Sequence, residues 1–143
     1  MTLNQHLAIT GVAAAALLPF WSNAEIAIFC TGSILIDVDH YLCYIQRTKR
    51  YSISGMFRYF EELWKIEHDI PYYGLCLFHT FDFFFLVATL AFFYPIFIPF
   101  LSGLLFHFGV DLFDLFRKKI PFIRAYFLVE HLVRRRQKGY PFF

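Results

Sequence analysis

Four long apolar stretches occupy most of this chain of 143 residues, at about 3–20, 24–46, 72–94 and 96–116. Each is close to the ~20 residues that an α-helix needs to cross the hydrocarbon core of a bilayer. Hydrophobic residues make up 59% of the chain and charged residues 17%, against about 25% charged in soluble domains. A soluble domain of this size has too little interior to bury so many apolar side chains. The sequence therefore predicts an all-α integral membrane protein, a bundle of about four transmembrane helices.

Polar residues and prolines mark the ends of these stretches. Ser22 and Asn23 can begin the second helix, and the helix-breaking residues at or near the ends are Pro19, Pro71, Pro95 and Pro121. The run from Leu7 to Leu18 also resembles a signal peptide, but no Lys or Arg precedes it. We therefore expect the first helix to be retained.

All 13 Lys and Arg residues lie in two segments, Arg47–Lys65 and Arg117–Lys138. If the four helices cross in alternation, both segments fall on one side of the membrane. The positive-inside rule then places that side, and both termini, in the cytoplasm. We expect an integral protein of a bacterial or archaeal cytoplasmic membrane.

The two basic segments are amphipathic, and they predict surface helices at about 53–67 and 121–138. With these helices, residues 1–143 form a single membrane-embedded helical domain. The Arg134-Arg135-Arg136 run is typical of contact with anionic lipid headgroups rather than of nucleic-acid binding. Membrane lipids are therefore the expected partners, and no nucleic acid is expected.

Histidine and aspartate recur at one depth in the four stretches, within about 5–15 Å of the predicted cytoplasmic helix ends. The residues are His6 in the first stretch, Asp37 and His40 in the second, His79 in the third, and His107 and Asp111 in the fourth. A carboxylate in hydrocarbon costs a few kcal/mol unless it is paired. Imidazole and carboxylate groups suit zinc, manganese or iron. The pattern predicts a site for one or two divalent ions, with zinc preferred.

Spacing within each helix adds detail to this site. Asp37 and His40 are separated by three residues, and His107 and Asp111 by four, so each pair shares a helix face. Asp39 does not share the Asp37 face in a regular helix. To join the site it needs either a local distortion of the helix or a position behind a ligand, where it contacts that ligand rather than the metal.

Several of these residues also have simpler interpretations. His6 alone is more often a hydrogen-bonded packing group than a metal ligand. Asp114 can pair with Arg117 three residues later, and Asp82 can orient His79. The three cysteines, Cys30, Cys43 and Cys76, show no metal-binding spacing and are expected to be buried thiols.

The order of these motifs resembles the YdjM-like membrane-bound metal-dependent hydrolases. That family carries Pro-Asp-Ile-Asp-His where this chain has Ile36-Asp37-Val38-Asp39-His40. Its Gly followed by His-x-x-x-Asp is similar to Gly103, His107 and Asp111. Ile36 replaces the family's Pro and predicts a regular second helix. Gly74 stands at the first His of the family's His-Arg-Gly-x-Thr-His-Ser segment, and no Arg follows it.

The resemblance implies metal-dependent hydrolysis of a phospholipid or another lipid-linked phosphoester at the cytoplasmic face. The metal ligands it implies are His6, Asp37, Asp39, His40, His79, His107 and Asp111. Three residues would act as general base or ligand orienter: Asp39, Asp82 and His68. Two alternatives stay open, a metal- or proton-binding membrane protein without hydrolysis and a helical bundle whose polar groups satisfy one another. A haem site is disfavoured by the nearby carboxylates.

Overall fold

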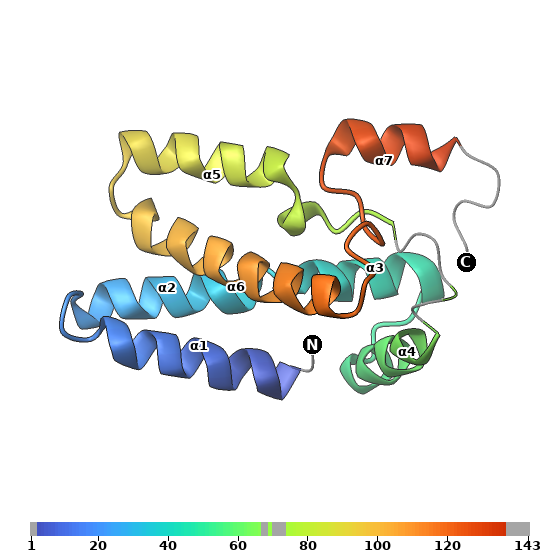
Figure 1. Ribbon diagram of the computed structural model, residues 1–143, viewed down its shortest axis with the longest axis horizontal. Coiled ribbons are helices and arrows are strands. Elements are labelled where there is room, and N and C mark those ends of the chain that lie inside the picture. Colours follow the sequence, from blue (N-terminus) through green and yellow to red (C-terminus); the bar gives the residue numbers. More distant parts are fainter. Residues whose placement is uncertain (1–2, 67–68, 70–73, 137–143) are drawn as a thin grey trace.

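The computed structural model describes residues 3–66, 69 and 74–136, and regular structure in this part of the chain is entirely helical (Figure 1). One isolated β-bridge joins Gly74 and Arg124. The elements in chain order are α1 (Leu3–Leu17), α2 (Asn23–Leu35), α3 (Val38–Thr48), α4 (Ile53–Lys65), the 3₁₀ turn η1 (Leu77–His79), α5 (Phe81–Phe93), α6 (Phe97–Arg117) and α7 (Leu128–Arg135). The all-α class predicted from the sequence is confirmed.

Two helical segments are long and apolar enough to cross a membrane, judged by length and composition. They are residues 23–45, which comprise α2 and most of α3, and α6. Helix α5 is apolar but has only 13 residues. Two of the four expected spans therefore meet the requirement among the described residues.

Helices α2 and α6 approach each other closely at two glycines. A Cβ atom on Gly32 would overlap the backbone carbonyl of Phe100, and one on Gly103 would overlap the carbonyl of Phe29. Because the obstructing atoms belong to the backbone, a side chain at either position could not be accommodated by a rotamer change. The two glycines thus permit the central helix pair of the fold.

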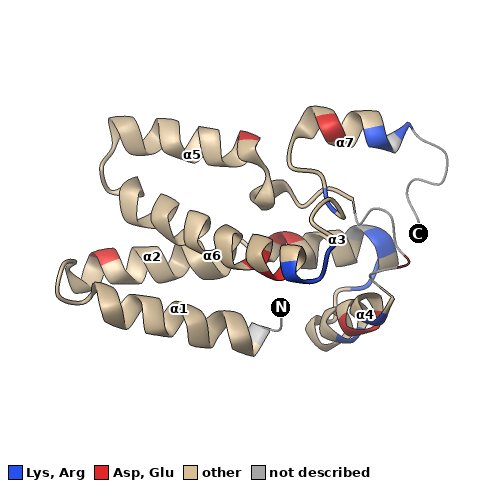
Figure 2. Cartoon of the chain, in the orientation of Figure 1, with Lys and Arg blue, Asp and Glu red and all other residues tan. Residues whose placement is uncertain are grey.

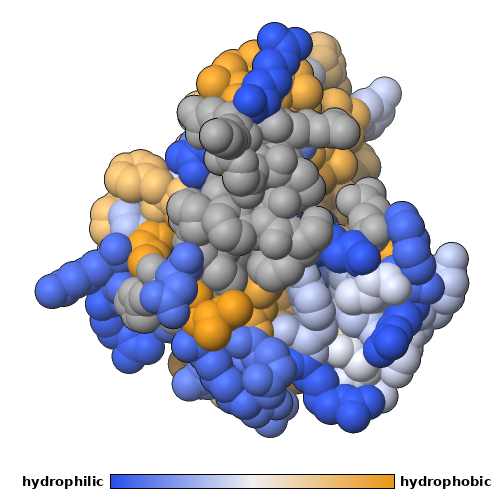
Figure 3. All heavy atoms as spheres, turned by 90° about the vertical axis from the view of Figure 1, so that its right-hand side faces the viewer, coloured by the Kyte–Doolittle hydropathy of each residue, from blue (hydrophilic) through white to orange (hydrophobic). Residues whose placement is uncertain are grey.

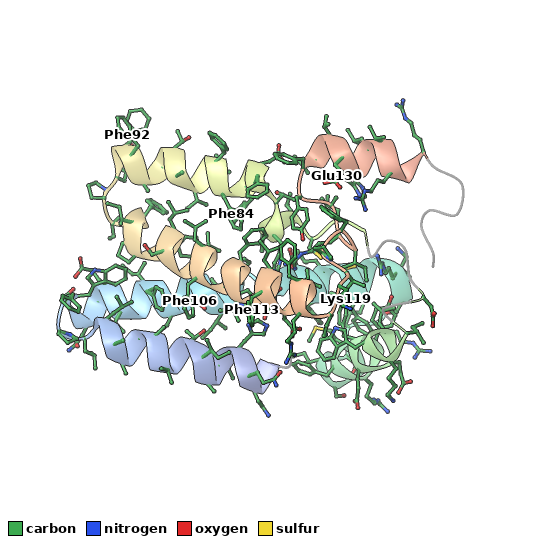
Figure 4. The ribbon with its side chains drawn as sticks, viewed as in Figure 1. Phe84, Phe92, Phe106, Phe113, Lys119 and Glu130 are labelled. Atoms are coloured by element: carbon green, nitrogen blue, oxygen red, sulfur yellow. The ribbon has the colours of Figure 1, made fainter. Side chains whose placement is uncertain are left out.

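Around this pair, a core of buried apolar side chains joins α2, α5 and α6, namely Ile36, Phe84, Val87, Leu104 and Phe108. Phe84 points toward α6, whereas Phe92 on the same helix points outward and is 82% exposed (Figure 4). Helix α1 is held to α2 by a buried hydrogen bond of 2.8 Å between the Thr10 and Ser33 hydroxyls. Ser22 begins α2 with a capping box to Glu25, as its position predicts.

The structure departs from the sequence prediction at three places, and all three are breaks in helices. The second stretch is interrupted at Ile36 and Asp37, where i to i+3 hydrogen bonds replace the α-helical pattern, so the expectation of a regular helix is wrong. In the third stretch the α-helix begins only at Phe81, after the 3₁₀ turn η1. Residues 121–127, expected to be helical, form an irregular segment before α7.

Charged residues gather at one end of the bundle (Figure 2). Between residues 7 and 36 Glu25 is the one Asp, Glu, Lys or Arg, and between residues 83 and 110 there is none. Figure 3 looks onto the charged end, where hydrophilic side chains gather over much of the lower part of the face. The three helix breaks also lie toward this end (Figure 1).

Candidate metal centre

The break between α2 and α3 places Asp37 at the start of α3, where its side chain makes no capping hydrogen bond. Its carboxylate instead faces three imidazoles. The distances from Asp37 Oδ1 to the Nε2 atoms are 3.3 Å for His107, 3.6 Å for His40 and 3.9 Å for His79. Helix interruption thus brings one carboxylate to histidines from three separate elements.

His79 lies on η1 and is fully buried, so its orientation depends on its neighbours. Asp39 Oδ2 lies 3.1 Å from His79 Nδ1 and also accepts a hydrogen bond of 2.9 Å from the backbone N–H of Phe78. The Asp39 carboxylate therefore orients the ring and leaves Nε2 pointing into the cluster. The sequence left open that Asp39 contacts a ligand instead of the metal, and this is what the structure shows. A carboxylate bonded to the second ring nitrogen is usual for a metal-binding histidine.

Helix α6 contributes His107 and Asp111, separated by one turn. Asp111 Oδ1 lies 3.0 Å from His6 Nε2, and Asp111 Oδ2 lies 3.5 Å from His79 Nε2. The rings of His6 and His107 stack with centroids 4.2 Å apart. Asp111 therefore joins the first helix to the rest of the cluster.

The separations among these atoms suit a divalent ion. Bonds of about 2.0–2.1 Å to a tetrahedral zinc ion keep neighbouring ligand atoms about 3.3–3.4 Å apart. Three groups of potential ligand atoms lie within 4.8 Å of one another: His6, His107 and Asp111; Asp37, His40 and His79; and Asp39, His40 and Cys76. The first two groups share no residue, so the cluster offers ligands for one or two ions.

Unsatisfied buried atoms provide an independent test of this fit. His79 Nε2 and both ring nitrogens of His107 are buried and make no well-aligned hydrogen bond among the described residues, although a carboxylate oxygen lies 3.5 Å from His79 Nε2 and another 3.3 Å from His107 Nε2. Buried polar groups without a partner cost about 1–3 kcal/mol each. Three carboxylates, Asp37, Asp39 and Asp111, face one guanidinium, that of Arg124, which leaves two negative charges if the imidazoles are neutral. A divalent ion would satisfy the ring nitrogens and balance this charge.

A cavity of about 150 Å³ opens beside the cluster. Its polar lining includes Asp37, His40 and Asp111. Asp37 and His40 remain partly exposed, with side-chain exposures of 23% and 29%, whereas His79 and His107 are almost fully enclosed. A molecule in the cavity would therefore meet the cluster at Asp37 and His40.

The sequence prediction missed Arg124, which is 4% exposed and lies at the same centre. Its Nη1 donates a hydrogen bond of 3.0 Å to Asp111 Oδ2. Burial opposes its charge, but the Asp111 carboxylate, together with smaller contributions from Cys76 and Tyr126, outweighs this effect, and the pKa of Arg124 is raised. The bridge to Gly74, whose φ of 112° favours glycine, fixes the backbone of Arg124. The one signal in the sequence is an arginine between the apolar residues Ile123 and Ala125.

Two residues that the sequence assigned a catalytic role, Asp82 and His68, are not among the residues that the structure groups in the cluster. The Oδ2 of Asp82 accepts a hydrogen bond of 2.8 Å from the backbone N–H of Leu128 and so holds the start of α7. The prediction that Asp82 orients His79 is wrong, because Asp39 occupies that position. His68 lies outside the described residues. Asp114 pairs with Arg117 at 2.7 Å, as its spacing predicts.

Comparison with known proteins adds no relative to this picture: no family model, no curated protein and no solved structure matches the chain. The resemblance to the YdjM-like hydrolases therefore rests on the motifs alone. What the structure contributes is the spatial grouping of seven residues from α1, the start of α3, η1 and α6, namely His6, Asp37, Asp39, His40, His79, His107 and Asp111.

Proposed function

We propose that this chain is a membrane-embedded, metal-dependent hydrolase that acts on a phospholipid or another lipid-linked phosphoester at the cytoplasmic face. The observation that carries the proposal is the convergence of buried, unsatisfied imidazole nitrogens on Asp37 and Asp111. This donor set of imidazoles and carboxylates is typical of zinc, manganese and iron sites.

Membrane insertion is supported by the outer surface of the bundle. Of the most apolar windows in the two candidate spans, only 28% and 39% is buried inside the fold, whereas the core helix of a soluble protein is mostly buried. Large apolar side chains point outward, among them Phe85 (76% exposed) and Phe113 (72% exposed). Lipid contact would remove this apolar surface from water.

A bound divalent ion would polarise a phosphoester and lower the pKa of a water molecule to about 7. The side chains of the protein would perform the other tasks. Asp39 keeps His79 in one orientation, and the rings of His79 and His107 are enclosed by the fold. Asp37 and His40, which line the cavity, are placed to contact the reacting group. Of the bases named from the sequence, Asp39 lies in the cluster and Asp82 holds the start of α7, while His68 is outside the described residues.

The second candidate is a metal-binding membrane protein without hydrolysis. Gly74 favours it, because glycine supplies no side chain where the related hydrolases have a histidine. Measurement of turnover separates the two candidates, since both require the same metal ligands.

Elemental analysis of the detergent-purified protein tests the metal site first. We expect one or two equivalents of zinc, manganese or iron in the wild type and at least a tenfold loss in His107→Ala and Asp37→Ala. The matched control is His131→Ala, which removes a histidine on α7 outside the cluster and should leave metal content unchanged. Metal-free wild-type protein from a metal-replete preparation would contradict the proposal.

Hydrolysis is measured on the same samples with phospholipid vesicles and phosphoester release as the readout. The proposal expects turnover that a chelator abolishes and the metal restores. Full metal content without turnover on any phospholipid would favour the non-catalytic candidate.

A further inference from the structure

The guanidinium of Arg124 has an unused hydrogen-bonding edge. Nη1 is bonded to Asp111, but Nε and Nη2 are buried and make no hydrogen bond among the described residues. The N–H groups of Nε and Nη2 point in parallel from one side of a guanidinium, and this edge matches two oxygens of a phosphate or carboxylate group. The face of Arg124 lies 5.7 Å from the centroid of the Phe108 ring. Its position is thus fixed while its bidentate edge is unbonded.

The location of this edge is informative. Arg124 lines the cavity, and so do two other cations, Arg47 and Lys118. The bond to Asp111 places the guanidinium beside the candidate metal centre. An anionic group bound at the free edge would therefore lie next to the ligands that face the cavity.

The opposite side of the cavity is apolar and comes from α4. It is formed by Met56, Phe57, Phe60, Leu63 and Trp64. The cavity of about 150 Å³ is smaller than the ~300–1,000 Å³ typical of sites that enclose a whole ligand. It has room for a headgroup, while an apolar chain could leave along the α4 side chains.

We propose that the Nε and Nη2 edge of Arg124 binds two phosphate oxygens of an amphiphilic phosphate ester, whose apolar part lies against α4. The choice of a phosphate ester rests on the proposed function. The inference itself concerns binding and not hydrolysis, so an experiment can contradict either one without the other. Arg124 acts as a positioning residue that sets the class of ligand.

Equilibrium titration of the detergent-purified, full-length protein with short-chain phosphatidic acid tests the inference. Arg124→Lys retains a positive charge for Asp111 but lacks the bidentate edge, and Arg124→Gln removes the charge. Since hydrogen bonds to charged groups contribute about 1.5–3 kcal/mol, we expect affinity to fall about 10- to 100-fold in both variants. The matched control, Arg58→Gln, removes an exposed arginine of α4 that does not line the cavity and should bind as the wild type does.

Metal content is measured on each sample because Arg124 also contacts Asp111. Loss of phosphatidic acid binding with unchanged metal content supports the inference. Wild-type affinity in Arg124→Lys, or loss of affinity only in proportion to lost metal, overturns it, because Arg124 would then act solely through Asp111. If binding is intact but no phospholipid is hydrolysed, the proposed function fails and the binding inference stands.

A second comparison identifies the source of the phosphate. Phe57→Ser on α4 should weaken phosphatidic acid binding and leave inorganic phosphate binding unchanged. If inorganic phosphate binds as tightly as phosphatidic acid in the wild type, the site takes free phosphate and the amphiphile part of the inference is wrong.

Discussion

The two ends of this helical bundle follow different structural rules. At one end α2 and α6 are regular, pack through Gly32 and Gly103, and carry hardly any charge. At the other end the chain breaks at Asp37, at η1 and at residues 121–127, and the His and Asp cluster lies among these breaks. A regular helix satisfies its own backbone but presents side chains on a fixed pattern. The comparison indicates that the regular end supplies rigidity, while the irregular segments deliver side chains that helix periodicity would keep apart.

The strongest way to break the regular end is to fill the α2–α6 contact. Gly103→Val would drive a side chain into the backbone carbonyl of Phe29, and we expect a loss of about 3 kcal/mol or more in the free energy of unfolding. Thermal unfolding in detergent measures the effect. Gly109→Ala on the same helix is the control, since a Cβ there meets nothing within 4 Å. Equal effects of the two substitutions would show that helix propensity, and not close packing, decides stability here.

At the irregular end, His107→Phe separates metal binding from folding. The phenyl ring replaces two buried nitrogens that make no well-aligned hydrogen bond, but it also removes the 3.3 Å contact between His107 Nε2 and Asp37 Oδ1, so we expect the metal-free protein to be within about 1 kcal/mol of the wild type. In the wild type a chelator should lower stability by about 3 kcal/mol, as for a ligand near 100 times its Kd. In the variant the chelator should have no effect. A chelator effect of equal size in both proteins would contradict the assignment of His107.

Asp39→Asn tests whether the break in α2–α3 serves to orient His79. The amide can keep the contact with Phe78 but can present the wrong partner to the His79 ring. We expect metal affinity to fall about 10- to 100-fold with little change in fold. Competition with a metal-sensitive dye measures the affinity. An Asp39→Asn protein with wild-type affinity would mean that packing alone orients His79.

The smallest effect is expected for Asp82→Ala, which removes the carboxylate bound to the backbone N–H of Leu128. We expect a loss of about 0.5–2 kcal/mol in stability, the range for a helix cap. Metal affinity should equal that of the wild type, measured by the same dye competition. A large loss of metal affinity would restore the role for Asp82 that the structure contradicts.

Much of the fold followed from local sequence patterns. The apolar stretches predicted α1, the start of α2 and almost the whole of α6, because apolar length and the capping signal of Ser22 are local properties. Depth along a helix also follows from residue number, which is why His6, His107 and Asp111 could be placed at one level. These predictions needed no knowledge of neighbouring helices.

The helix breaks were not predictable in the same way. Ile36 is compatible with a continuous helix, yet it is fully buried in the core while the adjacent Asp37 turns toward the histidines. Residues 121–127 have an amphipathic pattern but form the irregular segment that carries Arg124. In both cases the conformation depends on contacts with residues distant in the chain, such as the bridge between Gly74 and Arg124.

By itself, the sequence determined the helical class, the positions of the apolar helices and the supply of His and Asp residues near one end, because these depend on composition and on periodicity. Only the tertiary structure decided that Asp39 supports His79, that Asp82 holds α7, and that Arg124 reaches Asp111. The reason is that each of these contacts joins residues 13 to 46 positions apart. Pairings at such distances are selected by packing of the whole bundle, and no local pattern encodes them.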